Sequence, residues 1–281
     1  MKITLIGNGW GAESALKSLL RIEGTTIFFM SDDKFHHESV VNINHLNEVP
    51  SDTDLVICSG FTIKLNSDFL NKYSVINIHY SLLPSYRGLH STVWAILNNE
   101  KHLGLTIHYM NEYFDDGDII YQFQIENDYN STSYYYMQVF NKHIEENLDK
   151  VVFDLLNGNI KSVKQDKGKA SWVPRRKKKD CKIDFRNPIS YQKAFFRALV
   201  KPYPIPYIEV DEKIYNVIKV KFQSSDVISK LGCIVNIDDE GIWITCKDGY
   251  IIIQQLVDEQ TQNEVSLTIF KIGKIIQNDK H

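Results

Sequence analysis

Short apolar runs alternate with an amphipathic segment through the first part of the chain. Apolar runs of strand length cover residues 2–6, 26–30, 54–58 and 74–78. Between the first two, residues 12–22 place Leu16, Leu19 and Leu20 on one helical face. Strand and helix alternating in this way, with short apolar strands, is typical of a parallel sheet covered by helices. We therefore expect an α/β domain with a Rossmann-like, mostly parallel sheet.

The pattern changes in the second part of the chain. Helices are expected over residues 92–99 and 131–156, and strands over 103–110 and 118–125. A polar stretch then ends in the basic run RRKKK, and five short strands separated by turn signals follow between residues 207 and 256. We expect three parts: a larger first domain, a linker and a small C-terminal β-barrel or sandwich domain, with limits at residues 1–160, 161–185 and 186–281.

The amino-acid composition limits the class of protein to which this chain can belong. The 281 residues are 43% hydrophobic and 24% charged, with a net charge of −3, which suits a globular enzyme better than a nucleic-acid-binding protein. Four scattered cysteines form no Cys-x-x-Cys pair, so we expect neither a metal site nor disulfides, and a reducing cytoplasm. The apolar N-terminal run breaks at Gly7 and Gly9, too early for a signal peptide, and no run is long enough to span a bilayer.

A glycine-rich turn follows the first expected strand and opens a helix. The turn, GNGWG at residues 7–11, stands where a nucleotide phosphate can meet a helix N-terminus. Its spacing is G-x-G-x-G and not G-x-G-x-x-G, and Asp32 and Asp33 are an ordinary pair of acids after a strand. Three interpretations stay open: a redox dinucleotide, a nucleotide-bearing substrate, or glycines that only let the helix start close to the strand.

One group of polar residues carries candidate chemistry. Asn77 and His79 are two positions apart near the end of an expected strand, so they share one face of the sheet. Asp115 lies in the turn DDGD and can return beside them. An amide N–H or an imidazolium stabilises an oxyanion, and a carboxylate orients the histidine and helps to move a proton. These three residues therefore suit attack of an amine on a carbonyl carbon, in which no side chain becomes the nucleophile.

The wider segments around these residues resemble the 10-formyltetrahydrofolate-dependent formyltransferase family in order and spacing. The matching segments are NIHYSLLPSYRG at residues 77–88, WAI at 94–96, GLTIH at 104–108 and DDGDII at 115–120. A weaker resemblance continues through PRR at 174–176, IDF at 183–185, FRAL at 196–199 and PYP at 202–204. It implies an OB-like barrel for the C-terminal domain.

The resemblance also implies roles for individual residues. Asn77, His79 and Asp115 would be the catalytic residues, and 10-formyltetrahydrofolate would be the co-substrate. The folate pocket would be lined by three groups of residues: Phe61 and Ile63; Ser81, Leu82, Leu83 and Pro84; and Asn111, Glu112, Tyr113 and Phe114.

Three acceptor amines are weighed for such an enzyme. The chain is longer than the enzyme that formylates glycinamide ribonucleotide, which resembles only the first domain. The methionyl-tRNA enzymes have both domains and a basic loop early in the first, where this chain has a short, mildly acidic stretch over residues 31–48. RNA binding depends on phosphate neutralisation by Lys and Arg. The basic run at residues 175–179 is the counter-evidence, and it lies in the expected linker.

We expect a nucleotide-linked amino sugar as the acceptor, either dTDP-4-amino-4,6-dideoxyglucose or its 3-amino isomer, in the synthesis of bacterial surface polysaccharides such as O-antigen. A UDP carrier, the methionyl-tRNA reaction and a catalytically silent nucleotide-binding module remain alternatives. Tyr80 and His90 depart from the family pattern near the acceptor's expected entry. The residues expected to bind the sugar nucleotide are Gly9, Trp10, Tyr80, Arg87 and His90. A homodimer is left open, and neither a nucleic-acid nor a membrane partner is expected.

Overall fold

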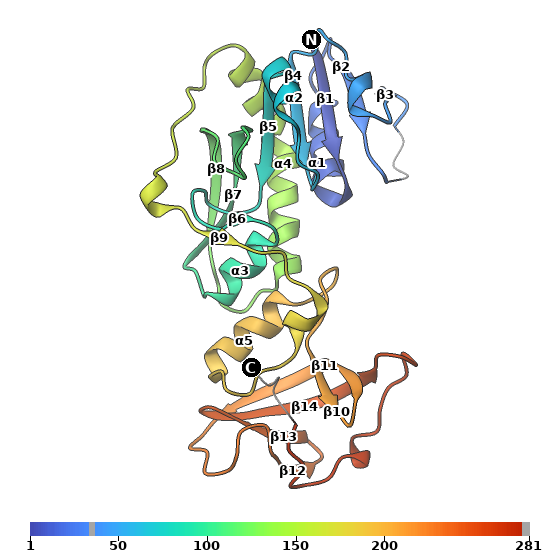
Figure 1. Ribbon diagram of the computed structural model, residues 1–281, viewed down its shortest axis with the longest axis vertical. Coiled ribbons are helices and arrows are strands. Elements are labelled where there is room, and N and C mark those ends of the chain that lie inside the picture. Colours follow the sequence, from blue (N-terminus) through green and yellow to red (C-terminus); the bar gives the residue numbers. More distant parts are fainter. Residues whose placement is uncertain (34–36, 277–281) are drawn as a thin grey trace. The chain divides into compact units, whose positions relative to one another are not determined.

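The chain forms two compact units in a computed structural model that describes residues 1–33 and 37–276 (Figure 1). The expected acidic stretch over residues 31–48 therefore includes three positions outside the described residues. The chain passes from the first unit to the second for the last time between Pro174 and Arg175. The first unit comprises Met1–Ala95, Lys101–Glu126 and Tyr135–Pro174, and the second comprises Ile96–Glu100, Asn127–Tyr134 and the chain from Arg175 onward. The expected domain limits at residues 160 and 185 stay a prediction.

A seven-stranded sheet organises the first unit, in the order β3-β2-β1-β4-β5-β7-β8. The five strands from β3 to β5 are parallel, whereas β7 is antiparallel to both β5 and β8. The prediction of a mostly parallel α/β sheet is confirmed. The strands are β1 (Lys2–Gly7), β2 (Thr26–Met30), β3 (Val40–Asn42), β4 (Leu55–Ser59), β5 (Val75–His79), β7 (His102–Tyr109) and β8 (Ile119–Glu126).

Two helices that are far apart in sequence pack together in this unit. They are α1 (Gly9–Leu19) and α4 (Ser133–Leu156), and Figure 1 shows both running along the sheet. Asp149 of α4 accepts hydrogen bonds from Ser18 of α1 at 3.3 Å and from Arg21 Nε at 3.0 Å. All five residues of β4 are buried, because this strand is central and covered on both faces, which accounts for its unbroken apolar run.

Several short elements were not expected from the apolar pattern. They are β3, α2 (Ser67–Lys72) and a two-stranded parallel pair formed by β6 (Arg87–Gly88) and β9 (Trp172–Val173). The helix expected over residues 92–99 is present as α3 (Ser91–Leu97). The start of α2 does have a signal, since the Asn66 side chain accepts a hydrogen bond from Phe69 N at 2.9 Å. The pairing of β6 with β9 joins residues 85 positions apart, which no local pattern encodes.

The second unit contains helix α5 and a five-stranded antiparallel sheet in the order β10-β11-β14-β13-β12. Its small antiparallel β architecture confirms the expectation for the C-terminal part. Its elements are α5 (Ile189–Ala198), β10 (Tyr207–Val210), β11 (Lys213–Ser224), β12 (Ile234–Asp238), β13 (Gly241–Cys246) and β14 (Gly249–Asp258). No helix among residues 1–33 and 37–276 is long and apolar enough to cross a membrane.

Candidate active site

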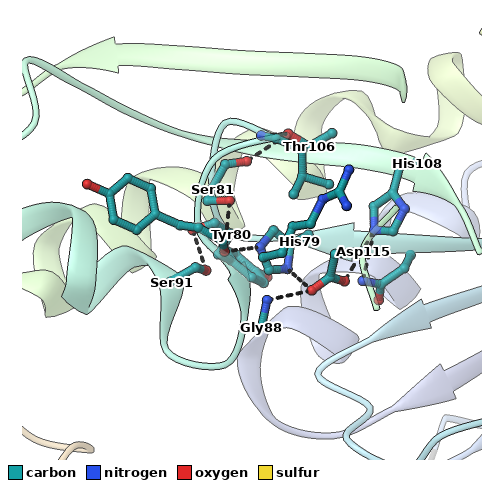
Figure 2. A network of polar contacts seen from close by, with 12 residues as sticks. His79, Tyr80, Ser81, Gly88, Ser91, Thr106, His108 and Asp115 are labelled. Atoms are coloured by element: carbon teal, nitrogen blue, oxygen red, sulfur yellow. Dashed lines mark hydrogen bonds and ion pairs between the residues drawn. The ribbon is translucent and has the colours of Figure 1, made fainter. Parts of the chain in front are cut away.

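Polar side chains gather where β5 ends and meets β7. Asn77 and His79 lie on one face of β5, and the antiparallel register places His108 directly opposite Asn77. The Asn77 amide nitrogen lies 3.3 Å from His108 Nε2. Figure 2 shows His79 and His108 on either side of Asp115. The structure therefore brings together all three residues predicted to be catalytic and adds a second histidine.

Asp115 reaches both histidines from the turn before β8. One carboxylate oxygen lies 3.6 Å from His79 Nδ1 and the other lies 3.6 Å from His108 Nε2. The first oxygen also accepts a hydrogen bond from Gly88 N at 2.8 Å. Asp115 has a φ of +49°, so the turn holds it in the left-handed region that non-glycine residues rarely adopt. The carboxylate is thus fixed by contacts on three sides.

Backbone carbonyls determine the tautomers of the two histidines. His79 Nε2 lies 3.0 Å from the Tyr86 carbonyl, and His108 Nδ1 lies 2.7 Å from the Tyr109 carbonyl. Because a carbonyl only accepts, each of these nitrogens carries a proton. In its neutral form His79 therefore presents the lone pair of Nδ1 to Asp115.

Burial and charge set different pKa shifts for the two partners. Burial, the largest influence on His79, lowers its pKa below the ordinary value of 6.5 even though the Asp115 carboxylate favours the cation. Burial also disfavours the charged form of Asp115. The contact with His108, the charge of His79 and the Gly88 N–H outweigh this effect and hold the Asp115 pKa at about 2. At neutral pH the pair is therefore a carboxylate beside a neutral imidazole.

The residues expected around the folate fall into an exposed group and a buried group. Ile63, Tyr113 and Phe114 are each about two-thirds exposed, and Lys64 Nζ lies 5.8 Å from the centre of the Phe114 ring. Asn111 and Glu112 are also exposed, whereas Phe61, Leu82 and Pro84 are half-buried. Ser81 and Leu83 are buried.

The buried group is organised by one threonine. The Thr106 hydroxyl donates to the Ser81 carbonyl at 2.7 Å and accepts from Leu83 N at 3.1 Å and from Gln122 Nε2 at 2.9 Å. Thr106 is opposite His79 in the register of β5 and β7. These bonds fix the loop after β5, so Ser81 and Leu83 shape its backbone more than they offer side chains to a ligand.

The residues expected to bind the sugar nucleotide do not form one group. Gly9 and Trp10 line a surface cavity of about 270 Å³ together with Glu13, Phe29 and Asp33. The Gly9 amide donates to the Asp33 carboxylate, so an acid of the chain itself occupies this donor at the start of α1. A β-carbon at Gly7 would collide with the Ser59 carbonyl, so this glycine also permits the close strand–helix turn.

The other three residues lie in different surroundings. Arg87 is only 3% exposed, and its guanidinium contacts Asp116 at 2.6 Å and Gln165 at 2.7 Å. The Tyr80 hydroxyl donates to Asn141 of α4 at 2.7 Å, and His90 is half-buried with a φ of +60°. Arg87 is thus engaged by neighbouring side chains, while Tyr80 is directed towards α4.

Two residues around the site had no role in the sequence-based prediction. His108 belongs to the segment GLTIH at residues 104–108, but its position opposite Asn77 depends on β7 running antiparallel to β5. Gln165 lies in the expected linker, and its side chain contacts Arg87 and the Asp115 turn. Within the part of the chain that the structure describes, no cluster of three or more His, Cys, Asp or Glu side chains is arranged to hold a metal ion.

Comparison with known proteins gives consistent matches for both units. A family model described as formyl transferase matches residues 23–152, and one described as formyl transferase, C-terminal domain, matches residues 175–280. The methionyl-tRNA formyltransferase of Thermosipho melanesiensis is 31% identical over 219 residues, which are 75% of this chain and 67% of the relative.

Solved structures share the fold at lower identity. An N-formyltransferase from Helicobacter canadensis, crystallised with folinic acid and dTDP-3-aminofucose, is 20% identical with a TM-score of 0.68, and the match covers 90% of this chain and 98% of that one. A variant of HypX from Aquifex aeolicus is 17% identical with a TM-score of 0.63, and the match covers 92% of this chain but only 45% of that one.

Proposed function

The chain belongs to the formyl transferase family, and we propose that it transfers the formyl group of 10-formyltetrahydrofolate to the amine of a nucleotide-linked amino-deoxy sugar. Formyl transfer from a folate derivative is the reaction of the family; the acceptor and the roles of individual residues are the proposal. The observation that carries it is the contact of Asp115 with His79 and His108, beside Asn77, at the end of β5.

The proposed reaction follows from the protonation states of these groups. The acceptor amine attacks the formyl carbon, a C–N bond forms, and the carbonyl electron pair moves to oxygen. An Asn77 N–H stabilises the resulting oxyanion. The proton lost by the amine goes to the His79–Asp115 pair and resides on His79 Nδ1, because Asp115, with a pKa of about 2, is the weaker base. The bond from the formyl carbon to the folate nitrogen then breaks, and that nitrogen takes up the proton.

The exposed side chains of Ile63, Tyr113 and Phe114 support a site for the folate. They come from the loop after β4 and the loop after β7, and the contact between Lys64 and Phe114 shows that these loops lie close together. Large apolar side chains left exposed in this way are characteristic of ligand-binding surfaces. The pterin ring would cover them, with Lys64 near its negatively charged glutamate tail.

Charge supports a small acceptor over an RNA. In the basic run at residues 175–179, Arg176 is buried with its guanidinium bonded to the Asp180 carbonyl, and Lys178 forms an ion pair with Glu259 at 2.6 Å. These two cations are already neutralised or enclosed. The cavity beside Gly9 and Trp10 also carries Glu13 and Asp33; because these carboxylates repel the phosphates of RNA and of a nucleotide diphosphate alike, the cavity favours neither acceptor. In this proposal the enzyme acts in the cytoplasm on sugar precursors of bacterial surface polysaccharide.

Transfer to initiator methionyl-tRNA is the second candidate, favoured by the names of the relatives at 26–31% identity. Both candidates are tested in one experiment. The purified protein is incubated with 10-formyltetrahydrofolate and, separately, with dTDP-linked 3-amino and 4-amino sugars, their UDP-linked counterparts and charged initiator tRNA, and formylated product is measured by mass spectrometry. We expect a dTDP-amino sugar to have the highest kcat/KM. Transfer to tRNA alone would refute the sugar proposal, and His79→Gln provides the inactive control.

A further inference from the structure

We propose that Gln165 is a positioning residue that holds the turn carrying Asp115 and thereby keeps the Asp115 carboxylate in contact with His79. The inference rests on the proposed reaction, in which that contact handles the proton. Gln165 lies 50 residues after Asp115 in the sequence, in a polar stretch that local pattern assigns to a linker. Its side chain is nevertheless buried.

The Gln165 amide is bonded at both of its ends. Its nitrogen donates to the Asp115 carbonyl at 2.8 Å and to the Gly117 carbonyl at 2.7 Å. Its oxygen accepts from Arg87 Nε at 3.2 Å and from Arg87 Nη2 at 2.7 Å. Both N–H groups are thus used on the two backbone carbonyls that define the turn. A glutamine side chain suits this place because it carries two donors and an acceptor on one planar group.

Arg87 connects this amide to the loop that also contacts Asp115. Its guanidinium lies 2.6 Å from the Asp116 carboxylate, so Asp116 and Gln165 hold it from two sides. The next residue, Gly88, donates its N–H to the Asp115 carboxylate at 2.8 Å. Gln165 and Arg87 together therefore fix both the backbone of the turn and the donor that orients the carboxylate.

Residues 163–173, which we call the clasp segment, hold Gln165 in place. Val163 exchanges two backbone hydrogen bonds of 2.8 Å with Ile119, just beyond the turn. At the other end, Trp172 and Val173 form β9 and pair with β6, which contains Arg87 and Gly88. The clasp segment is thus attached to the chain on both sides of the site, and Gln165 is the side chain that reaches between them.

The turn has a conformation that needs such support. Asp115 is in the left-handed region with a φ of +49°, and a β-carbon at Gly117 would collide with the Tyr109 carbonyl. A non-glycine residue in this region persists when surrounding contacts over-determine it. Without the two bonds from Gln165 we expect the turn to relax and the carboxylate to move away from His79. A displacement of about 1 Å at a reacting group costs on the order of 100-fold in rate.

The main test uses Gln165→Met, which keeps length and volume, introduces no charge, and removes both donors and the acceptor. Gln124→Met is the matched control, because Gln124 is exposed on β8 of the same unit. Thermal unfolding of each variant checks folding. We expect Gln165→Met to lower kcat by about 10- to 100-fold while both KM values stay within about threefold. The control should match the wild type.

The pKa of His79, followed by NMR on histidine-labelled protein, gives a readout that needs no acceptor. The titratable groups whose charges act on His79 are Asp115, which raises its pKa, and His108, which lowers it. Moving Asp115 away must therefore lower the His79 pKa. We expect Gln165→Met to produce at least half of the decrease produced by Asp115→Asn. An unchanged His79 pKa would overturn the proposal even if the acceptor assay had failed for every amine.

A double-mutant cycle separates positioning from general stability. If Gln165 acts through Asp115, Gln165→Met should cost little further activity in an Asp115→Asn background, because coupled residues are non-additive. Full additivity would contradict the proposal. Should Gln165→Met not fold, Gln165→Glu replaces it, since Glu keeps an acceptor for Arg87 but offers no donor to the two carbonyls. Wild-type kcat in Gln165→Glu would also refute the role.

Discussion

Replacing Asp115 with Asn tests the electrostatics of the site in both stability and activity. The Asp115 pKa is about 2, against an ordinary value of 3.8. A difference of nearly two units corresponds to about 2 kcal/mol of stabilisation at neutral pH. Because the folded-state pKa is the lower one, this stability is fully present above pH 5, declines as pH falls through 3.8, and is lost below about 2. Asp115→Asn should lack this contribution.

Urea unfolding at pH 7 and at pH 3 measures the effect. The difference in unfolding free energy between wild type and Asp115→Asn should shrink by about 1 kcal/mol from pH 7 to pH 3, because roughly half of the linked stability has gone by then. Asp239→Asn, at an exposed carboxylate of the second unit, serves as the control. A wild-type advantage that did not depend on pH would show that Asp115 has no depressed pKa in the folded chain. Activity should fall in parallel, since the pair that receives the proton is broken.

Three further predictions concern the same site. Asn77→Ala should lower kcat by about 100-fold with little change in the KM for folate, as expected for loss of one oxyanion donor, and steady-state kinetics would show it. Because burial lowers the pKa of His79 below 6.5 and the reaction needs its neutral form, the pH at which kcat is half-maximal should lie below 6.5; a half-maximal point above pH 6.5 would contradict this. Thr106→Val should destabilise the protein by about 1–3 kcal/mol in urea unfolding, because the buried Leu83 N–H and Ser81 carbonyl lose their shared partner.

The two-residue period of side chains along a β-strand was sufficient to predict the arrangement of Asn77 and His79. Asn77 and His79 are two positions apart, so their common face follows from the strand alone. The position of Asp115 in the turn DDGD suggested that it could return beside them, and the family resemblance implied its catalytic role. The place of His108 was not predicted, because the sheet changes from parallel to antiparallel between β5 and β7, and an apolar run does not specify strand direction. If the antiparallel direction of β7 had been known, the strand register would have placed His108 opposite Asn77.

Gln165 was not predicted for a different reason. Polar residues in a polar stretch are normally solvated, and local composition carries no sign that this side chain is enclosed. Its burial results from hydrogen bonds to residues 48, 50 and 78 positions away. Arg87 illustrates the converse: a motif arginine expected to meet a substrate is 3% exposed and paired inside the protein. In both cases the environment is set by pairing between distant segments.

The clasp segment also determines when the site can be assembled during synthesis. Asn77, His79, His108 and Asp115 all leave the ribosome before Gln165, so the first 160 residues can form the sheet while the Asp115 turn still lacks its two side-chain donors. Those donors, and the pairing of β9 with β6, arrive only when the chain has emerged to residue 173. A truncated protein ending at residue 160 would therefore contain every residue of the proposed catalytic group and still lack the contacts that arrange it.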